Sequence, residues 1–274
     1  EYYQEKYGTP LYGLNKLYLL MEKQHNRGQD GAGVATIKLD PTPGLNFIDR
    51  SRSTDKQAIQ KIFAKIHGGY NEAISSDTNC LNDVAALKER MPFMGELLMG
   101  HLRYATFGKD GEENCHPRRR LNNWITRNLV VAGNFNMTNV DELFDLLVSI
   151  GQHPKERSDT MTVLEKIGHF LDKENDRLVQ LHQQLGYNDR QVTKIMAEKL
   201  DVQSILKQSA IDFDGGYALA GMIGHGDAFV LRDPAGIRPA YFYQDDEIAV
   251  VASERPVIQT VFNVPFEKVQ ELQP

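Results

Sequence analysis

Four short apolar segments follow one another near the end of the chain, and only tight turns separate them. The segments are GGYALAGMIG (215–224), DAFVLRD (227–233), PAYFYQ (239–244) and EIAVVAS (247–253). Connections this short join antiparallel neighbours, because a parallel pair needs a crossover connection of about a dozen or more residues. The end of the chain therefore predicts antiparallel sheet.

Helical patterns lie at both ends of the chain and in its middle, where apolar residues recur at three- and four-residue steps. The expected helices cover residues 10–24, 55–66, 82–90, 138–150, most of 159–208, and 255–262. Further strands are expected at 33–39, 95–105 and 127–135. Strands and helices are thus segregated rather than alternating. We predict one compact α+β domain over residues 1–274, with helices and antiparallel sheets in separate layers.

The composition excludes several classes of protein. The 274 residues carry a net charge of −6, which argues against nucleic-acid binding as the main role. No window approaches the roughly 18 consecutive apolar residues of a membrane span. The two cysteines, Cys80 and Cys115, cannot form a disulfide framework, and they favour a reducing compartment, the cytoplasm. No histidine or cysteine spacing matches a metal site, so neither a metal nor a cofactor is expected.

Three polar residues lie where side chains commonly converge, and the sequence leaves two interpretations open for the first two of them. Arg103 in GHLRYATFG is either half of an ion pair at a strand end or a clamp for a carboxylate. Asn134 in AGNFN belongs either to a turn before a helix or to a donor pair that stabilises an oxyanion. Asp159 in ERSDT is most simply a helix cap.

Two arginine-rich strings favour structural roles. The run Arg118–Arg120 is typical of a solvated face. The string RDPAGIRP predicts a turn between strands, with Arg232, Asp233 and Arg238 in a charge network. None of these patterns alone identifies a function.

Taken in order along the chain, the motifs resemble the class II glutamine amidotransferase domain. Within that class they look most like the glutaminase domain of the amidophosphoribosyltransferase family. The matching strings are QHNRGQDGAG (24–33), GHLRYATFG (100–108), AGNFNMTNVDELF (132–144), SDT (158–160) and RDPAGIRP…ASERP (232–256). The polar helical stretch from about 172 to 207 is the least covered and is interpreted as an insert.

The resemblance implies the fold of an N-terminal nucleophile (Ntn) hydrolase. That fold is a four-layer α/β/β/α sandwich in which two antiparallel sheets are stacked. It also implies a reaction, in which a Cys at the mature amino terminus attacks the side-chain amide of glutamine. The α-amino group of that Cys handles the proton and ammonia leaves.

The resemblance also assigns residues to the site. Arg103 would bind the α-carboxylate of glutamine and Asp159 its α-ammonium group. The Asn134 side chain and the Phe135 backbone N–H would form the oxyanion hole. Tyr104 and Thr106 would line the pocket, while Arg27 and Gly28 would hold a loop against the nucleophile.

The sequence departs from the family pattern at the nucleophile. Neither Cys80 nor Cys115 is amino-terminal, so we expect the native chain to carry its first strand and catalytic Cys upstream of Glu1. The chain as given is expected not to hydrolyse glutamine. Asn26 is an extra residue in the first motif. Phe135 stands where the family commonly has Gly, and a positive φ there would cost about 1–3 kcal/mol.

The resemblance further implies partners for the domain. The ammonia acceptor would be phosphoribosyl diphosphate, bound to a phosphoribosyltransferase domain after Pro274, and the reaction would belong to purine synthesis. The protein would be a homo-oligomer. No cofactor is expected in this domain. Two alternatives stay open: an inactive amidotransferase-like module that binds glutamine or mediates assembly, and a glutaminase that feeds another acceptor, such as a sugar phosphate.

Overall fold

The structure is a computed structural model that describes residues 1–104 and 111–274. By its internal contacts the chain divides into two compact units. Unit 1 comprises Glu1–Pro117 and Pro239–Gln273, and unit 2 comprises Arg118–Arg238 with Pro274. The expectation of one domain across 1–274 stays a prediction.

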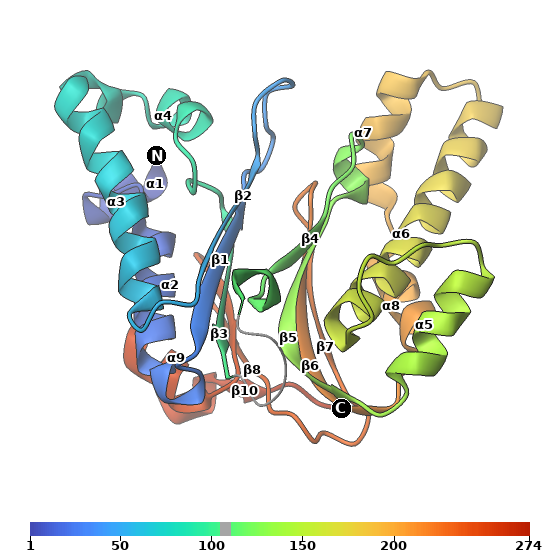
Figure 1. Cartoon of the computed structure of the whole chain (residues 1–274). Coiled ribbons are helices and arrows are strands. Elements are labelled where there is room, and N and C mark those ends of the chain that lie inside the picture. The colour runs from blue at the N-terminus through green and yellow to red at the C-terminus, as the bar shows by residue number, and fades with distance from the viewer. Residues whose placement is uncertain (105–110) are drawn as a thin grey trace. The chain divides into compact units, whose positions relative to one another are not determined.

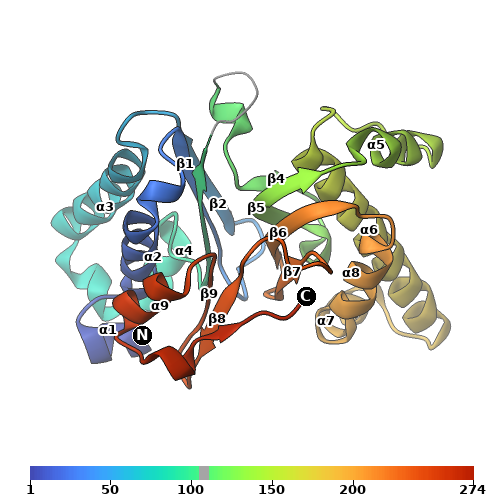
Figure 2. The same cartoon turned by 90° about the horizontal axis from the view of Figure 1, so that it is seen from below.

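Unit 1 contains an antiparallel sheet in the order β2-β1-β3, and helices α2 and α3 cover one of its faces (Figures 1 and 2). Its elements are α1 (Tyr2–Tyr7), α2 (Tyr12–Lys23), β1 (Gly31–Ile37), β2 (Ile48–Ser53), α3 (Ala58–Ser76), α4 (Val84–Arg90) and β3 (Leu97–Arg103). Ala32 and Val34 of β1 point to the helices and pack with Leu17 of α2 and Phe63 of α3. Alternation along β1 places Gly31 and Gly33 on the opposite face, which we call the open face of this sheet.

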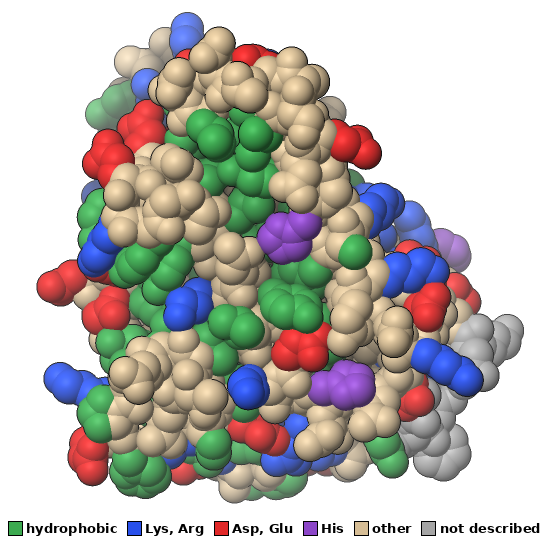
Figure 3. All heavy atoms as spheres, turned by 90° about the vertical axis from the view of Figure 1, so that its left-hand side faces the viewer, with side chains coloured by type: hydrophobic (Ala, Val, Ile, Leu, Met, Phe, Trp, Pro, Cys, Tyr) green, Lys and Arg blue, Asp and Glu red, His purple; other side chains and the backbone are tan. Residues whose placement is uncertain are grey.

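A second, smaller sheet of unit 1 has the order β10-β8-β9. Its elements are β8 (Tyr241–Gln244), β9 (Ala249–Ala252), α9 (Arg255–Phe262) and β10 (Gln270–Glu271). Ile258 of α9 is fully buried against Ala252 and Val269, and Val257 and Val261 pack with Leu20 of α2. The helical side of unit 1 exposes apolar side chains between acidic and basic ones (Figure 3).

Unit 2 contains an antiparallel sheet in the order β4-β5-β6-β7, with helices over one face (Figures 1 and 2). Its elements are β4 (Arg118–Arg120), β5 (Leu129–Met137), α5 (Val140–Ser149), α6 (Asp159–Gln184), α7 (Asp189–Lys199), α8 (Val202–Ala210), β6 (Gly215–Ile223) and β7 (Ala228–Arg232). The core joins Leu129 and Val131 of β5 to Leu164, Ile167 and Leu171 of α6, all almost fully buried.

The α+β class with antiparallel sheets is confirmed, and so are the helices at 10–24, 138–150 and 159–208. The four short strands near the end of the chain do not share a sheet, however: β6 and β7 belong to unit 2, and β8 and β9 to unit 1. Stacking of the two larger sheets stays a prediction. No helix among the described residues is long and apolar enough to span a bilayer.

Candidate functional site

Arg103 ends β3 on the open face of its sheet and lies opposite Gly31 in the register. Its neighbour Leu102 points the other way and packs with the core beneath the helices. The two side chains thus alternate between the faces of the sheet, as successive residues of a strand do. Arg103 is 8% exposed, whereas Tyr104 is 67% exposed. Thr106, the other predicted pocket residue, lies outside the described residues.

The loop before β1 lies directly against the backbone of Arg103. The Asp30 N–H donates a hydrogen bond of 3.0 Å to the Arg103 carbonyl oxygen. A Cβ on Gly28 would lie 2.7 Å from both the carbonyl carbon and the oxygen of Arg103. Gly28 has an extended backbone, with φ of −168°, so glycine is required here by the close approach and not by the conformation. Arg27 forms an ion pair with Glu254, and its own side chain is 65% exposed.

Gly28→Ala should therefore displace this loop from Arg103, because the new Cβ meets backbone atoms that cannot rotate away. We expect a loss of about 1–3 kcal/mol in the free energy of unfolding, the usual cost of overpacking, together with weaker glutamine binding. Urea denaturation checks the first effect. Gly68→Ala in α3 is the control, because its Cβ would meet nothing within 4 Å. Equal stability of the Gly28→Ala protein and the unsubstituted protein would contradict the close approach.

Asn134 and Phe135 lie within β5, opposite Ala218 and Tyr217 of β6. The turn expected at AGNFN is therefore wrong, because the strand continues to Met137. The Asn134 side chain is exposed, while Phe135 packs against the core beneath the helices of unit 2. Phe135 is not among the described residues with positive φ, so the strain considered for this position does not arise. Whether these two groups form an oxyanion hole stays a prediction.

Asp159 is the first residue of α6, and the cap of that helix is its neighbour Ser158. The Ser158 hydroxyl accepts the Met161 N–H at 3.4 Å. Asp159 Oδ1 accepts the Thr160 N–H at 2.7 Å. Burial nevertheless raises the pKa of the Asp159 carboxyl above its ordinary value, despite the hydrogen bonds from Thr160. A carboxylate in this position is stabilised by a cation, which the α-ammonium group of an amino acid would supply.

Asp159→Asn should make the protein without ligand more stable near neutral pH. A carboxyl whose pKa is raised by folding holds its proton more tightly in the folded state, so its contribution to stability is present below the unfolded pKa and lost as pH rises through the folded value. Asparagine carries no charge at pH 7, so the Asp159→Asn protein should not lose this stability. Its melting temperature at pH 7 should be higher than that of the unsubstituted protein.

Asp189→Asn is the matched control for Asp159→Asn, because Asp189 is the first residue of α7 and is exposed. It should not stabilise the protein, since the charge near a helix N-terminus is favourable when solvated. A lower melting temperature for Asp159→Asn than for the unsubstituted protein would show that the cost of burying the Asp159 carboxylate does not outweigh its hydrogen bonds.

The structure groups the predicted site residues by unit. Arg27, Gly28, Arg103 and Tyr104 belong to unit 1, and Gly28 lies close to the backbone of Arg103. Asn134, Phe135 and Asp159 belong to unit 2. That the two groups face one substrate stays a prediction.

Comparisons with known proteins show what this chain is similar to. No protein-family model matches the sequence. The chain is 26% identical to the amidophosphoribosyltransferase of Pasteurella multocida over 267 residues, which is 94% of this chain and 42% of that protein. It is 24% identical to the amidophosphoribosyltransferase of Methanothermobacter thermautotrophicus, over 84% of this chain and 44% of that protein. The chain is a homologue of amidophosphoribosyltransferases. It spans less than half the length of these relatives.

Solved structures agree with this relationship at the level of the fold. The glutamine phosphoribosylpyrophosphate amidotransferase of B. subtilis superposes with a TM-score of 0.59 at 21% identity, covering 95% of this chain and 43% of that chain. A structure described as the allosteric regulatory enzyme of purine biosynthesis gives a TM-score of 0.60 at 21% identity. The fold is therefore that of the Ntn-type amidotransferases.

Sequence reasoning missed the clamp that holds the RDPAGIRP loop of this amidophosphoribosyltransferase homologue. Asp233 is fully buried and accepts the N–H groups of Ile237 at 2.8 Å and Arg238 at 3.0 Å. Burial raises the pKa of this carboxyl, but the backbone donors outweigh burial and hold the pKa below its ordinary value. Arg232 donates to the Gly236 and Arg238 carbonyls. Both side chains thus bind backbone groups of the loop, and the charge network expected among these residues stays a prediction.

The run Arg118–Arg120 is also not the solvated face that the sequence suggested. Arg118 pairs with Glu156 at 3.2 Å, and Arg120 pairs with Asp172 of α6 at 2.5 Å. These pairs attach the edge strand β4 to the residues before α6 and to α6 itself.

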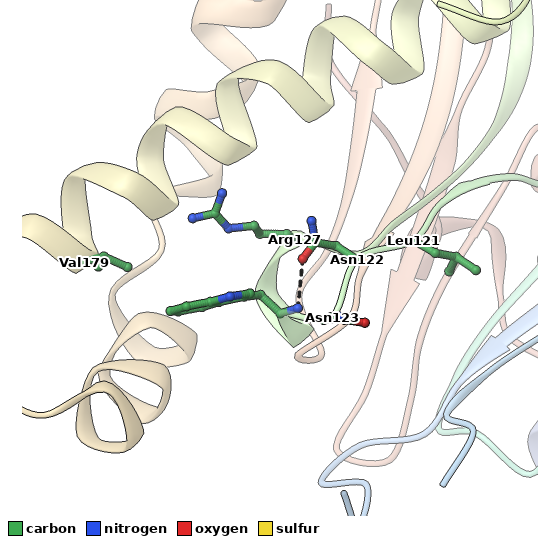
Figure 4. Close-up of a pocket in the computed structure, with 6 residues that line it drawn as sticks. Leu121, Asn122, Asn123, Arg127 and Val179 are labelled. Atoms are coloured by element: carbon green, nitrogen blue, oxygen red, sulfur yellow. Dashed lines mark hydrogen bonds between the residues drawn. The ribbon is translucent and has the colours of Figure 1, made fainter. Parts of the chain in front are cut away.

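The pocket drawn in Figure 4 lies in unit 2 and contains none of the predicted site residues. It is open to solvent, has a volume of about 610 Å³ and is lined by Leu121, Asn122, Asn123, Trp124, Arg127 and Val179. Arg127 pairs with Asp176 at 2.6 Å and lies over the Trp124 ring. Among the described residues, no group of three or more His, Cys, Asp or Glu side chains could hold a metal ion.

Proposed function

We propose that this chain is the glutaminase part of a glutamine amidotransferase that releases ammonia for phosphoribosyl diphosphate. The observation that carries the proposal is the similarity to amidophosphoribosyltransferases along nearly the whole chain. Since the chain spans 42% of that relative, we propose that a phosphoribosyltransferase domain follows in the native protein and takes up the ammonia. We also propose that the protein is a cytoplasmic homo-oligomer and that this part of it needs no cofactor.

The proposed mechanism assigns one task to each residue. Arg103 binds the substrate carboxylate through two parallel hydrogen bonds, and Asp159 binds the α-ammonium group. The attack on the amide carbon produces an oxyanion, which the Asn134 amide and the Phe135 N–H stabilise. Tyr104 is proposed to line the pocket.

The nucleophile of the proposed mechanism is a cysteine upstream of Glu1. Cys80 and Cys115 are both buried and internal, so neither has the free α-amino group that would accept the thiol proton. The α-amino group of an amino-terminal cysteine accepts that proton and returns it to the amide nitrogen, which leaves as ammonia. Water then hydrolyses the glutamyl thioester and releases glutamate.

Release of glutamate from glutamine tests the proposal. The 274-residue chain should release none, and the chain extended by its native upstream residues should release glutamate and ammonia in equal amounts. Replacing the upstream cysteine with alanine should abolish release while the protein stays folded. Hydrolysis by the chain as given would refute the position of the nucleophile, and no release by the extended chain would favour an inactive module.

A second candidate differs in the ammonia acceptor. The glutamine–fructose-6-phosphate aminotransferase of Sulfurisphaera tokodaii is 29% identical over 57% of this chain. A sugar phosphate is therefore the alternative acceptor. Addition of phosphoribosyl diphosphate or of fructose 6-phosphate to the complete protein separates the two, because only the true acceptor should yield an aminated product.

A further inference from the structure

Gly31 and Gly33 on the open face of β1 lie against another part of the chain. A Cβ on Gly33 would lie 1.9 Å from the His116 carbonyl oxygen, and a Cβ on Gly31 would lie 2.8 Å from the Cys115 sulfur. Even alanine is too large at either position. The segment Glu113–Pro117 therefore lies directly on this strand.

Two arginines of β2 hold that segment through its backbone. Arg52 Nη1 donates to the carbonyls of Glu113 at 3.1 Å and Cys115 at 3.0 Å. Arg50 Nη1 donates to the Pro117 carbonyl at 3.4 Å. Charged donors form stronger hydrogen bonds than neutral ones, so three such contacts define the path of a segment that has little regular structure.

The segment also lies beside the side chain of Arg103. The point that a Gly31 Cβ would occupy is 2.8 Å from the Cys115 sulfur and 3.7 Å from the Arg103 Cβ, so thiol and arginine flank the same gap. Cys115 is 0% exposed and Arg103 is 8% exposed. The His116 ring lies 4.3 Å, between centroids, from that of His101, which precedes Arg103 by two residues on the same face. The aliphatic part of the Arg103 side chain is thus bounded on this side by the segment Glu113–Pro117.

We propose that Glu113–Pro117 is a positioning element for Arg103. The segment restricts the rotamers of the arginine side chain and so prepares the guanidinium group for the substrate carboxylate. Preorganisation of this kind increases affinity, because less side-chain freedom is lost on binding. The inference rests on the proposed role of Arg103 in binding glutamine.

Cys115→Val tests the proposal in the complete protein, because the larger side chain has no room beside Gly31 and must move toward Arg103. We expect the KM for glutamine to rise about tenfold, while kcat changes less than about twofold. Cys80→Val is the matched control, since Cys80 is the other buried cysteine of unit 1 and lies outside the segment. It should lower the melting temperature similarly and leave KM unchanged. Cys115→Ala, which crowds nothing, should restore a KM near the normal value.

A second measurement does not need glutamine. Modification of Arg103 by phenylglyoxal, located by mass spectrometry, should become several-fold faster in Cys115→Val and stay unchanged in Cys80→Val. If Cys115→Val does not fold, Arg52→Gln replaces it, because this change removes the contacts to Glu113 and Cys115 from outside the segment. Unchanged phenylglyoxal reactivity in the folded variant would overturn the inference. Altered reactivity without any glutamine turnover by the unsubstituted protein would overturn the proposed function alone.

Discussion

Arg103→Ala in the complete protein should raise the KM for glutamine about 10- to 100-fold with a much smaller change in kcat. A hydrogen bond to a charged group contributes about 1.5–3 kcal/mol, and 1.4 kcal/mol corresponds to a factor of ten. The α-carboxylate of glutamine takes no part in the bond changes. Its contact with arginine is therefore equally strong in the ground state and in the transition state, and its loss appears in KM.

Steady-state kinetics of glutamate release measure this effect, and two further variants define it. Arg103→Lys should give an intermediate KM, because an ammonium group keeps the charge but not the two parallel donors. Arg90→Ala, at the exposed end of α4, should leave KM unchanged. Unchanged kinetics of Arg103→Ala would remove this residue from the substrate site.

Asp233→Ala should lower the free energy of unfolding by about 3–5 kcal/mol. The buried carboxylate accepts backbone N–H groups of Ile237, Arg238 and, at 3.3 Å, Tyr217. Each donor left buried without an acceptor costs about 1–3 kcal/mol. Because two of these N–H groups belong to the loop between β7 and β8, we expect that loop to lose its conformation before the sheet unfolds.

Urea denaturation measures the loss, and hydrogen exchange of the Ile237 and Arg238 amides locates it. Asp233→Asn should cost less, because the amide oxygen still accepts one hydrogen bond. Asp246→Ala, on an exposed turn, serves as the control. Protected amides in Asp233→Ala would contradict the role of the carboxylate as the clamp.

The same carboxylate predicts a dependence of stability on pH. Its folded pKa lies below the ordinary value, so the folded state binds a proton less readily than the unfolded state. Its contribution is complete above the unfolded pKa and is lost as pH falls through the folded value. The difference in stability between the unsubstituted protein and Asp233→Asn should therefore shrink on acidification below pH of about 4.

Local patterns explain most of what could be read before the structure. The helix at 138–150 was predictable because its apolar residues repeat at helical spacing. Arg103 could be assigned to the face opposite Leu102 because side chains alternate along a strand. The helix from Asp159 was predictable in the same way, but its cap is Ser158 and not Asp159, because neighbouring polar side chains can each serve as the cap.

The sequence by itself determined the class of fold, the antiparallel pairing and the relationship to amidotransferases, because periodicity, turn length and ordered motifs are local properties of the chain. Only the tertiary structure decided that β6 pairs with β5 and β7 with β6, while β8 and β9 belong to another sheet. It also decided that Gly28 touches the Arg103 backbone and that Glu113–Pro117 lies on Gly31 and Gly33. These contacts join segments far apart in the chain, and they depend on which surfaces are buried together. No local spacing encodes that choice.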